Sequence, residues 1–356
     1  MSFVAENTDY ETWLGTQCAV VKRDVKKKHD RMCESPFMFL RATYFRWAKQ
    51  TPVLFPDLMN TPAVLSVGDL HSENFGTWRD EDGRLIWGVN DFDEASIIPY
   101  AFDLVRLATS VRLAASEQKT SHRNAATAIV RGYKLGLKNP RPTFLDARDR
   151  WLRHYTQVSP GERRKFWKKV AKYPAPKKPP PPMVAQELSS RLPGGAKIIR
   201  YATRSVGGGS LGRVRYVVIA DWREGRVIRE AKALVQSAWN WAHGNKPATL
   251  YFKQLATQNH RAPDPYLDVK GDFIYRRLAP DSRKIELDKV ADFTLRRRVL
   301  IQMGFDVGAI HAADPNAAAI EPDLTQQDPD WLYDSAKIAA AAVERDYQEW
   351  CRHQRC

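Results

Sequence analysis

Two short polar segments, each preceded by an apolar run, constrain this chain more than any other feature. Residues 67–74 read Val-Gly-Asp-Leu-His-Ser-Glu-Asn, and residues 89–93 read Val-Asn-Asp-Phe-Asp. The apolar runs 63–67 and 84–89 have the length and patterning of strands. Asp-Glu-Asp-Gly at 80–83 is typical of a hairpin turn. The sequence therefore predicts a strand, an Asp loop, a hairpin and a second Asp loop in close succession.

This order of acidic and amide side chains suits phosphoryl transfer. The reaction needs a carboxylate that accepts the proton of the acceptor hydroxyl, and ligands that hold Mg²⁺ against the nucleotide phosphates. We expect Asp69 to be the general base and Asn74 and Asp91 to be the metal ligands, since their oxygens are hard donors. Asp93 is expected to order the metal loop, with ligation left open, while His71 either shapes the loop or contacts the substrate. The alternative is a polar turn whose carboxylates are merely solvated.

A glycine-rich segment at 205–219 is the second informative feature. Its glycines fit the pattern G-x-G-x-x-G, which occurs both in dinucleotide sites and in kinase-type loops. A dinucleotide site needs a helix directly after the third glycine, but residues 213–219 alternate and are rich in valine, which favours a strand. We therefore expect a hairpin tip over nucleotide phosphates, with a ligand-free glycine hairpin as the alternative. The residues expected to cover the phosphates are Gly207, Gly208, Gly209, Ser210 and Gly212.

The next predicted strand, around 226–234, should carry a lysine for the nucleotide phosphates. We expect this to be Lys232, with Arg229 as the alternative because it ends the clearest apolar run. A kinase would also supply a glutamate that pairs with the lysine. Residues 233–262 contain no acidic residue, so the expected partner is one of Glu230, Asp264 and Asp268.

The rest of the chain reads as helices and one unusual connection. Helices are expected at about 10–30, from Pro36, from Pro99, at 121–137, within 287–313 and at 328–353. Arg41 is expected to form an ion pair or contact an anion, and His311 to be a core histidine. Residues 143–196, with four consecutive prolines, are predicted to be a basic linker or insertion. This segment would separate residues 1–142, which carry the two Asp loops, from the later part of the chain. That later part consists of residues 197–278, with the glycine segment and the lysine, and the helices of residues 279–356.

Charge and cysteine content limit the possible environments and partners. The net charge is +15, and eleven lysines and arginines against two glutamates fall between 160 and 200. Such a segment is either a solvated face or attracts polyanions such as nucleic acid. The four cysteines show no metal-ligand spacing and are expected to be reduced. With acidic residues near the start and no apolar run long enough to span a bilayer, the chain is predicted to be cytoplasmic, without a membrane partner.

The motifs resemble those of known families. Gly68-Asp69-Leu70-His71 with Asn74, followed by Asn90-Asp91-Phe92-Asp93, is similar to the catalytic and metal segments of the protein-kinase-like superfamily, in particular the aminoglycoside and choline phosphotransferases. In these phosphotransferases an Asp that follows the metal motif braces the catalytic loop, and the resemblance implies this role for Asp103. Here these motifs precede the glycine segment, so the resemblance implies a circularly permuted kinase-like fold. The whole arrangement resembles the bacterial DUF2252 family, although residues 229–233 fit that family less well. The family name records no function, so it implies a fold and no substrate.

The sequence favours an α+β, two-lobed kinase-like fold with a mostly helical C-lobe and a small antiparallel N-lobe sheet. The expected activity is Mg²⁺- and ATP-dependent phosphorylation of a hydroxyl on a small molecule. A nucleotide-binding pseudokinase or nucleotidyl-transferring relative is the first alternative, and a nucleic-acid-binding protein that uses the basic segment is the second. A metallophosphoesterase is disfavoured because the upstream and downstream metal motifs of that fold are absent.

Overall fold

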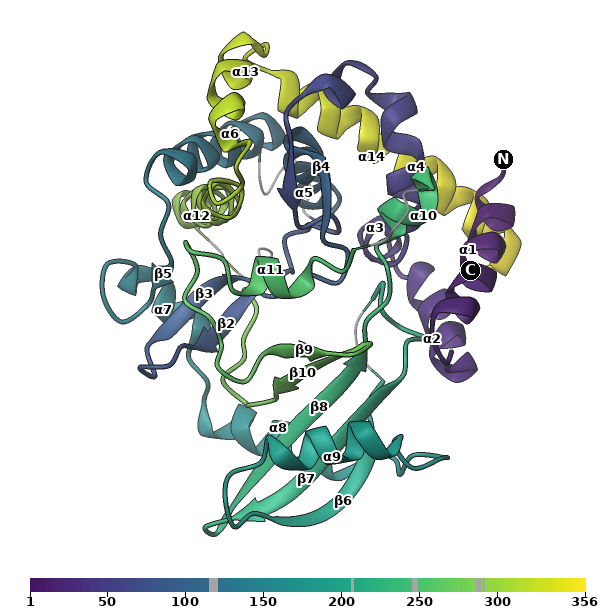
Figure 1. Ribbon diagram of the computed structural model, residues 1–356. Coiled ribbons are helices and arrows are strands. Elements are labelled where there is room, and N and C mark those ends of the chain that lie inside the picture. The colour runs from purple at the N-terminus through teal and green to yellow at the C-terminus, as the bar shows by residue number, and fades with distance from the viewer. Residues whose placement is uncertain (115–120, 206–207, 245–248, 286–289, 291) are drawn as a thin grey trace.

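The computed structural model describes residues 1–114, 121–205, 208–244, 249–285, 290 and 292–356. It has a mixed α+β fold with small antiparallel sheets, and a helical part lies above a five-stranded sheet in Figure 1. Within the described residues no helix is both long and apolar enough to cross a membrane. The helices are α1 Phe3–Gln17, α2 Lys22–Met32, α3 Pro36–Ala42, α4 Tyr44–Leu54, α5 Tyr100–Ala114, α6 His122–Lys138, α7 Arg153–Thr156, α8 Pro160–Ala171, α9 Pro182–Ser190, α10 Ala238–His243, α11 Phe252–Ala256, α12 Phe293–His311, α13 Ile320–Gln326 and α14 Trp331–Gln354. The strands are β1 Ala63–Ser66, β2 Phe75–Arg79, β3 Leu85–Val89, β4 Ser96–Pro99, β5 Thr143–Phe144, β6 Lys197–Thr203, β7 Arg215–Trp222, β8 Gly225–Ala233, β9 Asp268–Lys270 and β10 Phe273–Arg277.

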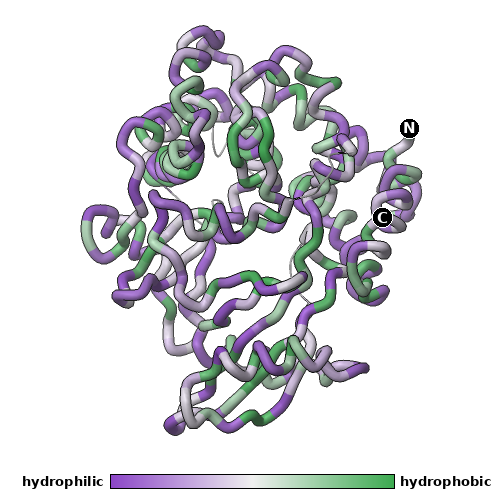
Figure 2. The backbone as a smooth tube through the Cα atoms, viewed as in Figure 1, coloured by the Kyte–Doolittle hydropathy of each residue, from purple (hydrophilic) through white to green (hydrophobic). Residues whose placement is uncertain are grey.

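The predicted hairpin is confirmed, and it lies against the helical part. Strands β2 and β3 pair antiparallel with Phe75 opposite Val89, and β5 adds a third strand. Strand β1 pairs with β4, which leads directly into α5. Helix α5 is buried from Tyr100 to Val111, and Figure 2 shows many hydrophobic residues along the central helices of this part. The two Asp loops therefore project from short strands that are fixed on a buried helix.

Helices α6 and α12 pack closely through four glycines. Gly132 and Gly136 on α6 face Gly304 and Gly308 on α12, and a Cβ atom on any of them would overlap the backbone of the other helix. At Gly132 the added Cβ would fall directly on the carbonyl oxygen of Ile301. Small residues four apart thus allow the two backbones to touch along the length of the pair.

Substitution of Gly132 by alanine is expected to destabilise the fold by about 2–3 kcal/mol, because backbone atoms cannot yield as a side chain can. The matched control is Gly15→Ala, also in a helix, where an added Cβ meets no atom within 4 Å. That control should be neutral or slightly stabilising. Urea unfolding of both variants measures the difference, and equal midpoints would contradict the close packing.

The five-stranded sheet is antiparallel throughout, with the order β6-β7-β8-β10-β9. Both faces are covered by helices from the segment that precedes it. Helix α8 packs through Val170 on Val217 and Ile219, whereas α9 packs through Val184 and Leu188 on the opposite face. The alternation of side chains along β7 explains why consecutive valines belong to different cores.

Residues 143–196, which were predicted to be a linker or an insertion, are more than a bare connection. Helices α8 and α9 lie within that range, and they form the two covering layers of the sheet. The proline run only connects them. Composition suggested a spacer because basic and proline residues are frequent, while the few apolar residues that pack on the sheet are widely spaced.

The first predicted helix is also divided in two. Helices α1 and α2 are separated at residues 18–21, where Val20 pairs with Arg213 and the Val21 N–H donates to the Gly212 carbonyl. The prediction of four reduced cysteines is wrong for one pair, because Cys33 forms a disulfide with Cys356. This bond joins the end of α2 to the end of α14, and Cys18 and Cys351 are free thiols.

Candidate active site

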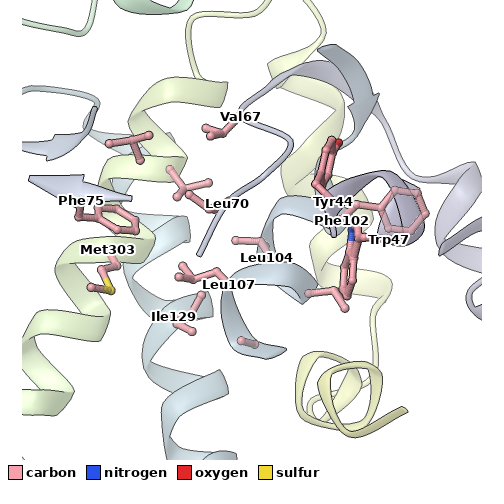
Figure 3. Packing of buried hydrophobic residues seen from close by; sticks show 14 of the residues in the cluster. Tyr44, Trp47, Val67, Leu70, Phe75, Phe102, Leu104, Leu107, Ile129 and Met303 are labelled. Carbon is pink, nitrogen blue, oxygen red and sulfur yellow. The ribbon is translucent and has the colours of Figure 1, made fainter. Parts of the chain in front are cut away.

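The loop that carries Asp69 is held from behind by Asp103 on α5. One carboxylate oxygen of Asp103 accepts a hydrogen bond from the Val67 N–H at 2.8 Å, and the other accepts from the Gly68 N–H at 2.9 Å. Asp103 is fully buried, and His311 approaches it to 3.3 Å. The predicted bracing role of Asp103 and the core position of His311 are therefore confirmed. Figure 3 shows Val67 and Leu70 of this loop among buried residues of the core.

Asp69 is oriented by an arginine to which the sequence analysis gave no role. Arg106, one turn after Asp103 on α5, donates to Oδ1 of Asp69 through Nε at 3.0 Å and also through Nη2. Its guanidinium is fully buried, 5.0 Å from the ring centres of both Tyr44 and Trp47. Because Arg106 occupies Oδ1, the free oxygen of Asp69 is Oδ2. The available signal was an arginine within an otherwise apolar helix.

The surroundings of Asp69 bring the pKa of its carboxyl group close to neutral pH. Burial raises the pKa of Asp69 to about 7, while the adjacent Arg106 opposes this rise. A general base works best when its pKa lies near the working pH. Asp69 therefore has both the free oxygen and the basicity that proton abstraction requires.

This environment predicts a pH dependence. In the metal-free protein, the Asp69 carboxyl should titrate near pH 7, so that the base is ionised above this value and protonated below it. Carboxyl ¹³C NMR of aspartate-labelled protein should show one step near pH 7 that is missing in Asp69→Asn. A titration of Asp69 near pH 4, as for an exposed aspartate, would contradict the account.

The two predicted metal ligands are brought together by the register of the hairpin. Since Phe75 lies opposite Val89, Asn74 and Asn90 are neighbours, and the Asn90 N–H donates to the Asn74 carbonyl at 3.0 Å. Nδ2 of Asn74 donates to the Asp69 carbonyl at 2.8 Å, which leaves Oδ1 for a metal. The Asp91 side chain is 41% exposed and lines the cavity described below.

Asp93 provides an independent indication of a cation site. Its Oδ2 pairs with Lys232 and with Arg213, the latter at 3.2 Å. Its Oδ1 is buried and has no hydrogen-bond partner among the described residues. An orphaned carboxylate oxygen is costly, and a cation held beside it by Asn74 and Asp91 would satisfy it. The residues present therefore fit Mg²⁺.

Strand β8 places Lys232, and not Arg229, at the site. The Lys232 ammonium is buried, contacts Asp93 and lies 3.6 Å from Oδ1 of Asp91. Arg229 is on the other side of the strand, where it donates to the Arg191 carbonyl and stacks on Tyr266. Burial raises the pKa of Asp91, but the charges of Lys232, Arg276 and Lys284 and a hydrogen bond with Asp93 together hold this pKa below its ordinary value.

The prediction that Lys232 pairs with Glu230, Asp264 or Asp268 is wrong, because among the described residues none of the three forms an ion pair with it. Glu230 pairs with arginines, Asp268 pairs with Arg191 and Lys253, and Asp264 accepts from the Tyr266 N–H. The actual partners come from the metal loop far away in the sequence. Spacing along β8 could not reveal them, because they are brought together only when the sheet docks on the helical part.

Glu230 holds a cluster of arginines together in the wall of the cavity. It is fully buried, and its carboxylate pairs with Arg276 at 2.7 Å, Arg204 at 2.8 Å and Arg215 at 3.4 Å. Burial would raise the pKa of Glu230, but these guanidiniums hold it well below its ordinary value. All three arginines line the cavity. This group was not apparent in the sequence because Glu230 and its three arginines lie on four different strands or loops.

The glycine segment lies partly over Asp69. Gly208, Gly209 and Ser210 line the cavity, and Gly209 is so close that an added Cβ would be 3.5 Å from Oδ2 of Asp69. Gly207 falls outside the described residues. Gly212 does not line the cavity. It has φ +102° and packs on Val25 of α2, so its need for glycine is conformational.

These elements enclose a cavity of about 650 Å³ between the sheet and the helical part. Its lining contains eleven lysines and arginines and only six acidic residues, which favours an anionic ligand. The basic residues are Lys27, Arg31, Arg41, Lys169, Arg204, Arg215, Arg261, Arg276, Arg277, Arg283 and Lys284. One of them, Lys169, comes from the basic segment 160–200.

Comparison with known families gives one match. Residues 20–173 match the model of an uncharacterized protein family conserved in bacteria, DUF2252. This supports the predicted resemblance. The DUF2252 match covers less than half of the chain. It includes the two Asp loops and Arg106, and it ends before the glycine segment. No curated protein and no solved structure gives a significant match.

Proposed function

We propose that this protein transfers a phosphoryl group from Mg²⁺-bound ATP to a hydroxyl of a small molecule, on a circularly permuted, two-lobed kinase-like fold. The observation that carries the proposal is the convergence of Asp69, Asp91 and Gly209 on one cationic cavity, with Lys232 buried behind Asp91 and Asp93. These residues come from separate regions of the chain, and each has the chemistry that phosphoryl transfer requires. The helical part and the five-stranded sheet would be the two lobes.

In the proposed reaction each residue has a distinct role. Oδ2 of Asp69 accepts the proton of the acceptor hydroxyl, while Arg106 holds Oδ1 in place. Asn74 and Asp91 would hold Mg²⁺, with Oδ1 of Asp93 beside it. When bound, the metal would neutralise charge on the phosphates. Backbone N–H groups of Gly208 and Gly209 would bind the phosphates, and Lys232 would turn from Asp93 toward them.

A second candidate is a nucleotide-binding pseudokinase. It is favoured by the engagement of Lys232 with Asp93 and by the close approach of Gly209 to Asp69, which leaves little room for a phosphoryl group between them. Catalysis would require the glycine segment to move away from Asp69, whereas nucleotide binding by a pseudokinase would not require this movement. Nucleotide binding without turnover would distinguish the two.

The proposed site predicts metal-dependent stabilisation by nucleotide. Mg²⁺ and ATP together should raise the melting temperature of the wild type by several degrees, because binding stabilises the folded state. Asp91→Ala should lose this rise, since it removes a ligand. Asp82→Ala, in the exposed turn of the hairpin, is the matched control and should behave as wild type. Absence of any shift with ATP, GTP and other nucleotides would contradict the proposal.

A further inference from the structure

A second group of basic residues lines the cavity beside Asp69, apart from the Glu230 cluster. It consists of Arg41 from α3, His71 from the Asp loop and Lys284 from the segment that runs along β2. The proposed roles of the nucleotide and metal use none of these three. Three separate elements thus place cationic or hydrogen-bonding groups in the cavity that Asp69 also lines.

Arg41 is held in place but is incompletely satisfied. Its side chain is buried, its Nη1 pairs with Glu73 at 2.8 Å, and its guanidinium lies 5.5 Å from the ring centre of Phe37. Its Nε is buried and has no hydrogen-bond partner among the described residues. Leaving a buried donor of a charged group unpaired is costly, which indicates a missing acceptor.

His71 and Lys284 add two more donors. Nδ1 of His71 accepts a hydrogen bond from the Glu73 N–H at 3.1 Å, so the proton of the neutral ring is on Nε2. Burial, followed by the charge of Arg41, keeps the pKa of His71 well below its ordinary value, and the ring is therefore neutral. Lys284 lies in the cavity lining and forms no ion pair within the described part of the chain. A charge-assisted donor, a neutral N–H and an ammonium are thus all present.

We propose that the acceptor is itself an anion, a hydroxyl compound whose phosphate or carboxylate group binds to Arg41, His71 and Lys284. The inference rests on the proposed function and adds the class of the substrate. An oxyanion would satisfy the orphaned Nε of Arg41 and neutralise Lys284, and guanidinium groups bind such anions in a fixed geometry. Its location beside Asp69 would present the hydroxyl of the same molecule to Oδ2.

The test uses glycerol 3-phosphate and glycerate as anionic probes and glycerol as the neutral one. Each is titrated into the full-length wild type saturated with Mg²⁺ and a non-hydrolysable ATP analogue, and binding is followed by calorimetry. We expect at least one of the two anions to bind and glycerol not to bind. The stronger of the two anions identifies the group, phosphate or carboxylate, that the acceptor carries.

Variants locate the binding. Lys284→Met, at an exposed position, should weaken binding of the anion at least tenfold and change the nucleotide affinity much less, although the charge of Lys284 also acts on Asp91. Lys134→Met, exposed on α6, is the matched control and should change neither affinity. Arg41→Gln should also weaken anion binding, and because Arg41 is buried its folding is checked by its melting temperature. Equal anion affinity in wild type and Lys284→Met would overturn the proposal.

The two proposals can fail separately. If the nucleotide binds but neither anion does, the acceptor proposal is wrong and the phosphotransferase proposal stands. If the nucleotide does not bind, the phosphotransferase proposal is wrong. Titration of the two anions into the nucleotide-free wild type and Lys284→Met then still decides whether this group binds anions.

Discussion

Replacement of Asp69 by asparagine should lower the rate of phosphoryl transfer by about 10²- to 10⁴-fold, with little effect on nucleotide binding. The amide cannot accept the acceptor's proton, whereas its shape still fits between Arg106 and the loop. Burial has raised the pKa of the native carboxyl to about 7, so the substitution removes a base that is suited to neutral pH.

The rate can be followed as ADP release from Mg²⁺-ATP with the anionic probes as acceptors, and with transfer to water as the baseline. Asp82→Asn, in the exposed turn, is the matched control and should retain full activity. Folding and nucleotide affinity of Asp69→Asn are measured in parallel. Wild-type turnover in Asp69→Asn would show that another group is the base, and His71 would then be examined first.

Replacement of Glu230 by glutamine should destabilise the protein by about 3–5 kcal/mol, because three guanidiniums would lose their common counter-charge. The side chain is fully buried, so water cannot compensate for the loss. The control is Glu81→Gln in the exposed hairpin turn, where the change should be within about 0.5 kcal/mol.

The pH dependence of this effect has a definite sign. The pKa of Glu230 is lowered in the folded protein, so its stabilisation is present above the ordinary glutamate pKa and is lost as the pH falls below it. Urea unfolding at neutral and acidic pH should therefore show a smaller difference between wild type and Glu230→Gln at acidic pH. Equal stability of the two proteins at neutral pH would contradict the buried role of Glu230.

Local patterns predicted how the two Asp loops lie together. The hairpin register that joins Asn74 to Asn90 follows from the turn at 80–83 and the alternating strands. These two residues are close in sequence, so spacing and geometry are directly linked. Asp103 is far in sequence from Val67 and Gly68, and its bracing role was implied by the resemblance to the phosphotransferases.

Contacts between distant segments were not predictable in the same way. The partners of Lys232 are on the metal loop, and Glu230 gathers Arg204, Arg215 and Arg276 from different elements. Each of these residues looks like an ordinary charged residue in the sequence. Which charged residues form ion pairs depends on how the sheet packs on the helical part. This packing produces no periodic pattern in the sequence from which the pairs could be predicted.

The glycine segment shows the limit of motif matching. Gly208 and Gly209 line the cavity as predicted, whereas Gly212 matches the pattern for a different reason, its positive φ and its packing on Val25. Similarly, the basic and proline-rich region was read as a connector although Val170, Val184 and Leu188 anchor two helices on the sheet. Sparse apolar residues in a charged segment are easily overlooked.

Binding of Mn²⁺ as a substitute for Mg²⁺ tests the central claim most directly. Electron paramagnetic resonance should show about one tightly bound Mn²⁺ per chain when an ATP analogue is present, and much weaker binding without it. Asn74→Ala and Asp91→Ala should each abolish the bound signal, while Asp82→Ala should retain it. Mn²⁺ binding that is unchanged in Asp91→Ala, or that is independent of nucleotide, would contradict a phosphoryl-transfer site at this cavity.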